Sequence, residues 1–241
     1  IKMPKFRIIP RLEIKSGNVI KGMKMEGLKI IGKPEDFLID YASQGGDEIM
    51  YDDIVASLYN RHLDFKNIKH LSEKISIPFI ISGGINSINL AKKAFRSGAD
   101  KICLNTSIFK NKNFVKDLIK IYGSQSIACQ IQTKEILDTF EVFSESGRER
   151  MYIKLFDWIK TVEELNFGEI YLIFVDYDGT NKIPNLNFLK KCREKVKVPL
   201  IYGGGVKDEF DIKKIKEIGF NGVVMSNSLY SNKTKIQKLK I

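Results

Sequence analysis

Short apolar segments alternate with longer amphipathic segments along this chain of 241 residues. The apolar segments have the length and β-branched content of buried strands, whereas the longer segments carry apolar residues at helical spacing. The predicted strands are residues 7–14, 48–54, 79–82, 101–105, 127–132, 169–175, 200–202 and 222–226, and the predicted helices include 34–44, 87–97, 113–122, 155–165 and 209–218. Eight strands that each lead into a helix predict parallel β–α units closing into a (β/α)8 TIM barrel.

The first half of the sequence recurs in the second half at a constant spacing. IPFIISGGIN (77–86) is similar to VPLIYGGGVK (198–207), which begins 121 residues later, and other segments keep the same offset. LEIK (12–15) aligns with IQTK (131–134) at an offset of 119, so that Glu13 corresponds to Gln132. We therefore predict a single barrel domain over residues 1–241, built from half-barrels at about residues 5–122 and 123–232.

The composition, with 43% hydrophobic and 29% charged residues, is ordinary for a globular protein. The longest apolar runs are too short to span a bilayer. The N-terminal IKMPKFRIIP also lacks the long apolar stretch of a signal peptide. An odd number of cysteines, Cys103, Cys129 and Cys192, indicates reduced core thiols. We expect a cytoplasmic protein without a membrane partner.

The formal net charge of +11 suggests a nucleic-acid partner, but the distribution of the lysines does not. Lysines are scattered along the predicted helices, nearly all of which also carry acidic residues. No recognised nucleic-acid module is present. The charge therefore predicts a solvated lysine-rich surface and remains compatible with a small anionic substrate.

Glycine-rich turns follow two predicted strands in equivalent positions of the repeat. Such turns let backbone N–H groups approach an anion, and loops of this kind bind phosphate in many (β/α)8 enzymes. The strands that come next end in Asn-Thr-Ser and Ser-Asn-Ser. The alternative is that the glycines serve tight turns only. The predicted phosphate-binding residues are Gly83, Gly84, Asn105, Thr106, Gly204, Gly205, Asn227 and Ser228.

Acidic and amide side chains end three other predicted strands, where side chains of this fold usually belong to the active site. Asp178 can orient a substrate or transfer a proton, and Gly179 and Thr180 complete its turn. Asp53 closes the second strand at the same end. Gln132 closes the fifth strand on the side that Gln130 also faces, and we expect Gln130 to form hydrogen bonds inside the barrel.

Four charged residues begin predicted strands at the opposite end of the barrel. They are Arg7, Glu48, Lys101 and Glu169. They can form a salt-bridged plug in a central opening or a bottom-face ion network that serves stability alone. His62 and His70 lack metal-ligand spacing, so neither a metal nor another cofactor is predicted. Residues 139–144, after the fifth strand, predict one arm of an inserted hairpin.

Seven segments together carry a resemblance to a known family: RIIPRLEIKSGNVIKG, DEIMYDDIVAS, IPFIISGGI, GADKICLNTS, YGSQSIACQI, GEIYLIFVDYDGT and VPLIYGGGV. Through them nearly the whole chain resembles the HisF family, the cyclase subunit of imidazole-glycerol-phosphate synthase. The resemblance implies a (β/α)8 barrel that takes ammonia from a glutaminase docked at its N-terminal face to a substrate with two phosphates at the other face. It further implies that the four strand-start charges form an ammonia gate, that Asp100 contacts the glutaminase and that Lys21 contacts substrate.

The predicted catalytic residues depart from the family. The family uses two opposed aspartates as acid and base, and this chain has Glu13 and Gln132 in their places. Glu13 keeps a carboxylate but is longer by one methylene, and such a displacement can cost on the order of a hundredfold in rate. The Gln132 amide cannot exchange protons near pH 7. Loss of one general acid or base costs about 100- to 10,000-fold in rate. Together with Asp178, these two positions are our candidate catalytic residues.

The intact gate beside an altered catalytic pair favours a divergent paralogue of the surface-glycan type. Such a subunit passes ammonia to a phosphorylated or nucleotide-sugar acceptor, with a sugar-amidating enzyme as a further partner. One alternative is a true imidazole-glycerol-phosphate synthase subunit of histidine biosynthesis. The other is a non-catalytic scaffold that binds phosphates and activates a glutaminase.

Overall fold

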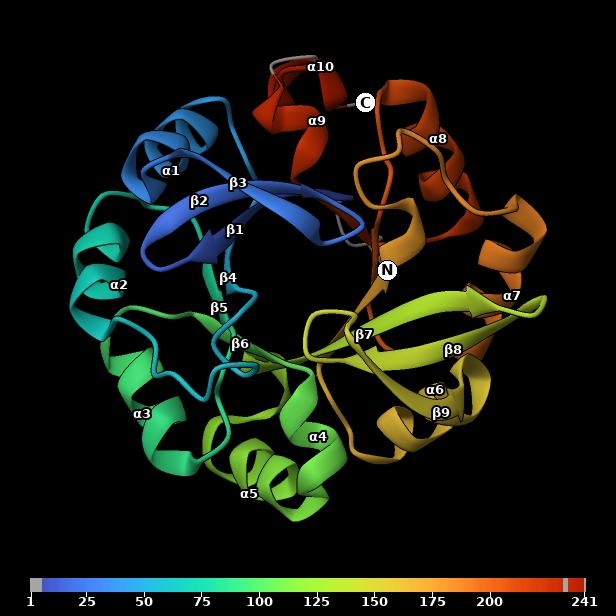
Figure 1. The fold of residues 1–241 in the computed structure, drawn as a ribbon, viewed down its shortest axis with the longest axis horizontal. Helices are drawn as coiled ribbons and strands as arrows, with labels where there is room; N and C mark the ends of the chain where they lie inside the picture. The colour runs from blue at the N-terminus through green and yellow to red at the C-terminus, as the bar shows by residue number, and fades with distance from the viewer. Residues whose placement is uncertain (1–5, 232–233, 241) are drawn as a thin grey trace, which may run out of the picture.

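The computed structural model describes residues 6–231 and 234–240 and contains a closed barrel of eight parallel strands. Each barrel strand pairs in parallel with the next, and β1 pairs with β12 to close the ring, from Arg7 opposite Gly222 to Pro10 opposite Met225. Figure 1 looks along the barrel axis, with the helices outside the strands. The barrel strands are β1 (Arg7–Lys15), β4 (Ile49–Asp53), β5 (Phe79–Ser82), β6 (Lys101–Leu104), β7 (Ile127–Ile136), β10 (Glu169–Phe174), β11 (Leu200–Gly203) and β12 (Gly222–Met225).

Helices connect successive barrel strands, as the alternation of the sequence predicts. Several begin at a side chain that accepts a hydrogen bond from the first turn, among them Asp64, Ser87, Asn111 and Asp208. The helices are α1 (Pro34–Ser43), α2 (Phe65–Ser72), α3 (Ile88–Arg96), α4 (Thr106–Lys110), α5 (Lys112–Tyr122), α6 (Leu155–Glu164), α7 (Leu186–Lys195), α8 (Glu209–Ile218), α9 (Asn227–Tyr230) and α10 (Ile236–Leu239), with 3-10 turns η1 (Ser124–Ser126) and η2 (Val175–Tyr177).

The two main apolar cores among the described residues result from the alternation of side chains along the strands, and a small third cluster forms around Ile20, Ile54 and Val55. The larger core lies between the strands and the helices and includes Ile8 and Leu12 of β1. The smaller core fills the barrel, and each barrel strand contributes to it. Its strand residues include Ile9, Met50, Ile80, Cys103, Ala128, Tyr171, Ile201 and Val224. Cys103, Cys129 and Cys192 are free and buried, so the structure contains no disulfide among them.

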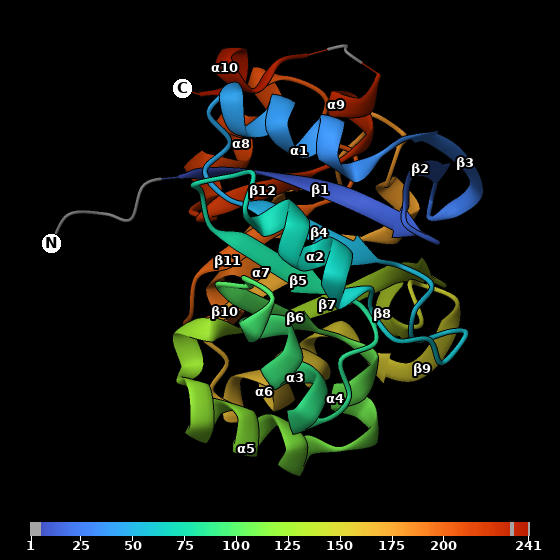
Figure 2. The same ribbon diagram turned by 90° about the vertical axis from the view of Figure 1, so that its left-hand side faces the viewer.

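Two hairpins extend from the C-terminal end of the barrel, at equivalent places in the two halves (Figure 2). One follows β1 and consists of β2 (Asn18–Met23) and β3 (Glu26–Gly32). The other continues β7 into β8 (Thr139–Ser144) and β9 (Glu149–Lys154). The predicted hairpin arm at residues 139–144 is therefore confirmed.

Sequence patterns missed the first hairpin and ended the fifth barrel strand too early. β3 has no buried residue, so the alternation that identifies a half-buried strand is absent from it. β7 runs four residues past the predicted end at Gln132, because antiparallel pairing with β8 carries it beyond the barrel core. No helix in residues 6–231 and 234–240 has the length and apolar character needed to cross a membrane. The proposed division into half-barrels at residue 123 stays a prediction.

Candidate active site at the C-terminal mouth of the barrel

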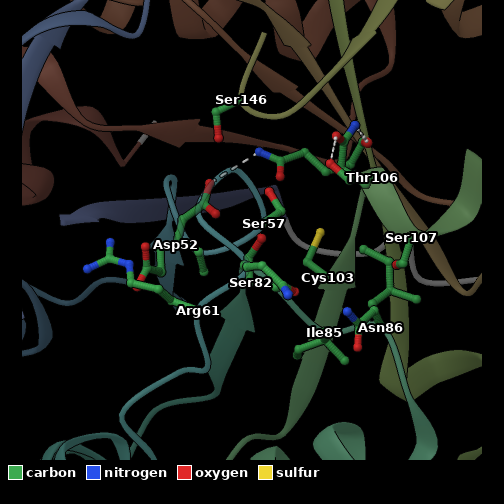
Figure 3. Close-up of a pocket in the computed structure, with 18 of the residues that line it drawn as sticks. Asp52, Ser57, Arg61, Ser82, Ile85, Asn86, Cys103, Thr106, Ser107 and Ser146 are labelled. Carbon is green, nitrogen blue, oxygen red and sulfur yellow. Dashed lines mark hydrogen bonds between the residues drawn. The ribbon is translucent and has the colours of Figure 1, made fainter. Parts of the chain in front are cut away.

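A pocket of about 720 Å³ opens at the C-terminal ends of the first-half strands. Its wall includes Asp53, Gly83, Gly84, Asn105 and Thr106, which the sequence predicted as substrate-binding residues. In Figure 3 the wall runs from Asp52 past Ser82 and Cys103 to Thr106 and Ser107, with Ser146 on the side of the second hairpin. The substrate-binding residues predicted in the first half of the barrel thus line a single pocket.

A second pocket of about 320 Å³ lies at the ends of the second-half strands. Its wall includes Gly179, Gly204, Gly205, Asn227 and Ser228, again as predicted, together with Arg11 and Asp178. The two pockets are built from equivalent elements of the repeat, β5–β6 in one case and β11–β12 in the other. Thr180 lies outside the lining of both, and its hydroxyl donates to the Tyr177 carbonyl at 2.7 Å.

The glycine turns have backbone conformations that exclude larger residues. At Gly83, with φ +108°, an added Cβ would lie 2.4 Å from the Asp53 carbonyl oxygen. At Gly205, with φ +75°, it would lie 1.7 Å from the Lys182 carbonyl oxygen. Such contacts are not tolerated without a backbone shift, so the glycines are required by their turns and also bring backbone close to the pockets. The tight-turn interpretation and the phosphate interpretation are therefore compatible.

Several polar side chains at the strand ends form hydrogen bonds within the protein. The Asn105 Nδ2 donates to the Gln130 carbonyl at 2.9 Å, and Thr106 Oγ1 donates to Asn105 Oδ1 at 3.2 Å. The Asn227 Nδ2 donates to the Gly22 carbonyl at 3.1 Å, and Ser228 donates to the Val206 carbonyl. These hydrogen bonds hold the loops at the strand ends in shape.

Glu13 is buried at the inner edge of the mouth, on the barrel-facing side of β1. Its carboxylate pairs with the Arg11 guanidinium and accepts from Ser226 Oγ at 3.3 Å, while its backbone N–H donates to the Tyr230 hydroxyl at 2.8 Å. Burial raises the pKa of Glu13 to about 7, with Arg11 opposing the shift and the carboxylates of Asp178 and Asp52 adding to it. A carboxyl group with this pKa can exchange protons at neutral pH.

Asp178 and Asp52 lie at the same mouth as Glu13. Asp178 is buried and is 3.4 Å from Arg11 Nη2, and burial raises its pKa despite the arginine. Asp52 accepts a hydrogen bond from Gln130 Nε2 at 3.3 Å, the interaction drawn in Figure 3. The expected internal hydrogen bond of Gln130 is thus present, one pleat below Gln132.

Gln132 reaches the mouth and lines the first pocket. Its Oε1 accepts a hydrogen bond from the backbone N–H of Gly147, in the turn of the second hairpin, at 2.9 Å. The side chain is buried, and an amide does not titrate near pH 7. Among the carboxyl groups of the mouth, burial raises the pKa of Glu13 to about 7 and also raises the pKa of Asp178.

The two hairpins meet over the mouth. The Arg148 Nη2 of the second hairpin turn donates to the Met25 carbonyl of the first at 3.1 Å, and the Met25 side chain is buried in the inner core. The Lys24 N–H donates to the Asp178 carbonyl at 2.9 Å. In Figure 1 the β2–β3 hairpin lies across the upper part of the barrel opening, and the turn between β8 and β9 comes near its centre. Lys21, the predicted substrate lysine, is half-buried on β2 opposite Lys29 and lines neither pocket.

The four strand-start charges form a closed ring at the other end of the barrel. Arg7 pairs with Glu48 at 2.7 Å and with Glu169, and Lys101 pairs with Glu48 at 2.9 Å and with Glu169 at 3.2 Å. Each cation bridges both acids, and the apolar inner core lies between this ring and the mouth. Exposed Asp100 precedes β6 at the same end, and its Oδ2 accepts from the Phe79 N–H at 2.8 Å.

Arg11 is the residue of the mouth that sequence patterns missed. It alternates with Glu13 on the inner side of β1, so a charged pair two residues apart in an otherwise apolar strand was the available signal. Among the residues that the structure describes, no group of three or more His, Cys, Asp or Glu side chains is arranged to hold a metal ion.

Comparison with known proteins agrees with this arrangement. A family described as "Histidine biosynthesis protein" matches residues 7–235. The imidazole glycerol phosphate synthase subunit HisF of Legionella pneumophila is 37% identical over 205 residues, which is 85% of this chain and 97% of that protein. HisF of Thermococcus onnurineus is 33% identical over 97% of this chain and 93% of its own length, and HisF of Flavobacterium psychrophilum is 35% identical over 98% and 94%. The chain belongs to the HisF family of histidine biosynthesis proteins.

Proposed function

We propose that this chain is the ammonia-using synthase subunit of an imidazole glycerol phosphate synthase, with a phosphorylated substrate held across the two pockets of the mouth. The observation that carries the proposal is the pair of pockets at the C-terminal mouth, one of them lined by Arg11, the ion-pair partner of Glu13, in a barrel whose other end holds a charged ring. The names of the three relatives compared above favour this function over the surface-glycan hypothesis, because each is named as a subunit of imidazole glycerol phosphate synthase.

Glu13 is the proposed proton-transfer residue. Its pKa of about 7 lets it both give and accept a proton, and Arg11 fixes its carboxylate in the mouth. Asp178 is proposed to orient the substrate through the same guanidinium. Gln132 is proposed to hold the second hairpin through Gly147 and to offer hydrogen bonds, without transferring a proton.

Ammonia is proposed to enter through the ring of Arg7, Glu48, Lys101 and Glu169 and to cross the inner core. A glutaminase subunit would dock around this end, where Asp100 is exposed. Arg7 and Lys101 each pair with both acids, so opening the ring requires at least one ion pair to break. A closed ring of this kind suits a gate that responds to a docked partner.

Turnover tests the proposal directly. The protein is given the formimino substrate of the histidine pathway with ammonium salt, without glutaminase, and product is followed. The gene is also introduced into a histidine auxotroph that lacks its own HisF. Ordinary enzyme rates and growth support the proposal, whereas neither product nor growth from folded protein refutes it. Stimulated glutamine hydrolysis with no product from the barrel would identify the scaffold alternative.

A second candidate function keeps the ammonia route and changes the acceptor. Gln132 favours it, because an amide replaces one of the family's two proton-transferring aspartates. A nucleotide sugar, bound here or by a sugar-amidating enzyme, would then receive the ammonia. Amidation of a nucleotide sugar in the presence of a glutaminase and glutamine, without turnover of the histidine-pathway substrate, would establish this function.

A further inference from the structure

The second pocket has a buried arginine in its wall. Arg11 is 3% exposed and is the only positively charged residue among the described residues that line this pocket. It comes from the inner face of β1, below the glycine turn of Gly204 and Gly205. The pocket therefore receives its positive side chain from the rigid barrel and not from a loop.

The two ends of the Arg11 guanidinium have different surroundings. Nη2 pairs with Glu13 and lies 3.4 Å from Asp178. Nη1 is fully buried and has no hydrogen-bond partner in the described part of the chain. A buried N–H group on a charged side chain is costly to leave unsatisfied, so a partner supplied by a ligand is expected there.

The half-barrel repeat provides an internal comparison. The offset of 119 that pairs Glu13 with Gln132 also pairs Arg11 with Gln130, which lines the first pocket. The side-chain amide nitrogen of Gln130 donates a hydrogen bond to Asp52 Oδ2 at 3.3 Å. The cations of the first pocket, Arg61 and Lys110, come from outside the barrel interior and are half-buried and exposed. The two pockets thus differ in where their positive charge lies.

We propose that Arg11 is a specificity-determining residue whose Nη1 binds a phosphate group of the ligand in the second pocket while its Nη2 holds Glu13. Planar guanidinium groups can serve two anions at once through separate nitrogens. The inference rests on the proposed function only in taking the ligand as phosphorylated. The phosphate bound by Arg11 would be the one nearer to Glu13, the proposed proton-transfer residue. The substrate would therefore lie with that phosphate-bearing end toward Glu13.

Nearby negative charge makes this binding depend on protonation. Glu13 of β1, Asp52 of β4 and Asp178 after β10 all face Arg11, and Tyr230 of α9 is close as well. A phosphate that joins this group adds like charge, which is relieved when a carboxyl group takes up a proton. Phosphate binding in the second pocket is therefore expected to be accompanied by proton uptake.

The test uses the full chain and inorganic phosphate, with backbone amide resonances as reporters. The amides of Gly204 and Gly205 report the second pocket, and those of Gly83 and Gly84 report the first. Arg11→Lys keeps the positive charge for Glu13 and Asp178 and removes the second nitrogen. We expect phosphate to bind roughly tenfold more weakly at Gly204 and Gly205 and unchanged at Gly83 and Gly84, as for loss of one charge-assisted hydrogen bond.

Gln130→Ala is the matched control, because it alters the equivalent position of the first pocket. It should leave the response of Gly204 and Gly205 unchanged. If Arg11→Lys does not fold, the double variant Arg11→Gln/Glu13→Gln removes both charges of the buried pair, and we expect it to lose phosphate affinity at the second pocket by about a hundredfold.

Unchanged phosphate affinity at Gly204 and Gly205 in either folded variant would overturn the inference. So would wild-type protein whose Gly204 and Gly205 amides do not respond to phosphate. Failure of the proposed function has a different signature, since phosphate would bind as expected while the histidine-pathway substrate is not converted. The two outcomes are therefore distinguishable.

Discussion

The side-chain oxygen of Gln132 accepts a hydrogen bond from the backbone N–H of Gly147 at 2.9 Å, which ties the end of a barrel strand to the turn of the second hairpin. The oxygen is thereby committed to the hairpin, and the amide nitrogen remains as a donor. In the half-barrel repeat this residue corresponds to Glu13, which has a pKa of about 7. Positions that correspond in the repeat thus carry a titratable carboxyl group in one half of the barrel and a hydrogen-bonded amide in the other.

Restoring a carboxylate at residue 132 should increase synthase activity. A second acid/base group contributes about 100- to 10,000-fold, so even an imperfectly placed carboxylate in Gln132→Asp or Gln132→Glu should raise ammonia-dependent turnover by at least about tenfold. The glutamate variant preserves the acceptor for Gly147. Gln130→Glu, which adds the same charge one pleat deeper, is the control and should give no increase. Equal turnover in wild type and both variants would mean that Gln132 does not limit the reaction.

Glu13 should make both activity and stability depend on pH. Its pKa is raised from 4.5 to about 7 by burial, so the folded protein binds a proton that the unfolded chain has released between these values. Its contribution to stability is complete below pH 4.5 and is lost as the pH rises from there through about 7, by on the order of 3 kcal/mol. Denaturant titrations from pH 5 to pH 8 should show this loss in wild type and not in Glu13→Gln.

The kinetic counterpart is an ionisation near pH 7 in the pH profile of kcat/KM. It should disappear, together with most of the activity, in Glu13→Gln. An unchanged profile in that variant would assign the ionisation to another group and remove Glu13 from proton transfer.

The charged ring should couple the barrel to its glutaminase and contribute little to chemistry at the mouth. Lys101→Met removes the cation that bridges Glu48 at 2.9 Å and Glu169 at 3.2 Å, so the two acids are left with Arg7 alone. We expect a loss of about 1–3 kcal/mol in stability, because these buried acids lose a partner. Glutamine-dependent turnover should fall several-fold while turnover with ammonium salt is maintained. Lys101→Arg should behave like wild type, and an equal fall in both assays would contradict the gate.

The glycine turns of the two pockets should differ in their tolerance of alanine. At Gly205 a Cβ would lie 1.7 Å from the Lys182 carbonyl oxygen, whereas at Gly84 its nearest contact is 3.0 Å, with the Ala56 Cβ. Both residues have positive φ, so each substitution adds backbone strain of about 1 kcal/mol. Gly205→Ala should destabilise the protein by a further 1–3 kcal/mol or so, because backbone must move. Urea denaturation of both variants measures the difference, and equal losses would show that the second turn relaxes freely.

The sequence by itself determined the barrel and predicted its division into two similar halves. Eight apolar segments alternating with amphipathic ones are sufficient for parallel β–α units, and the constant spacing between repeats shows which residues are equivalent. It also predicted that the glycine turns and the strand-end side chains would meet, because the C-terminal ends of parallel strands share one face. These inferences depend on periodicity, which is a local property of the chain.

Only the tertiary structure decided how the side chains at the mouth divide their interactions. Arg11 belongs to the mouth because closure of the barrel brings it into contact with Asp178, which lies 167 residues later in the chain, as well as with nearby Glu13. The Thr180 hydroxyl donates to the Tyr177 carbonyl, a contact that only the folded loop reveals. The strand β3 has no buried residue and so left no alternating pattern to detect. Hydrogen-bond partners and the pKa of Glu13 depend on burial and on charges brought together from distant strands, which no local pattern encodes.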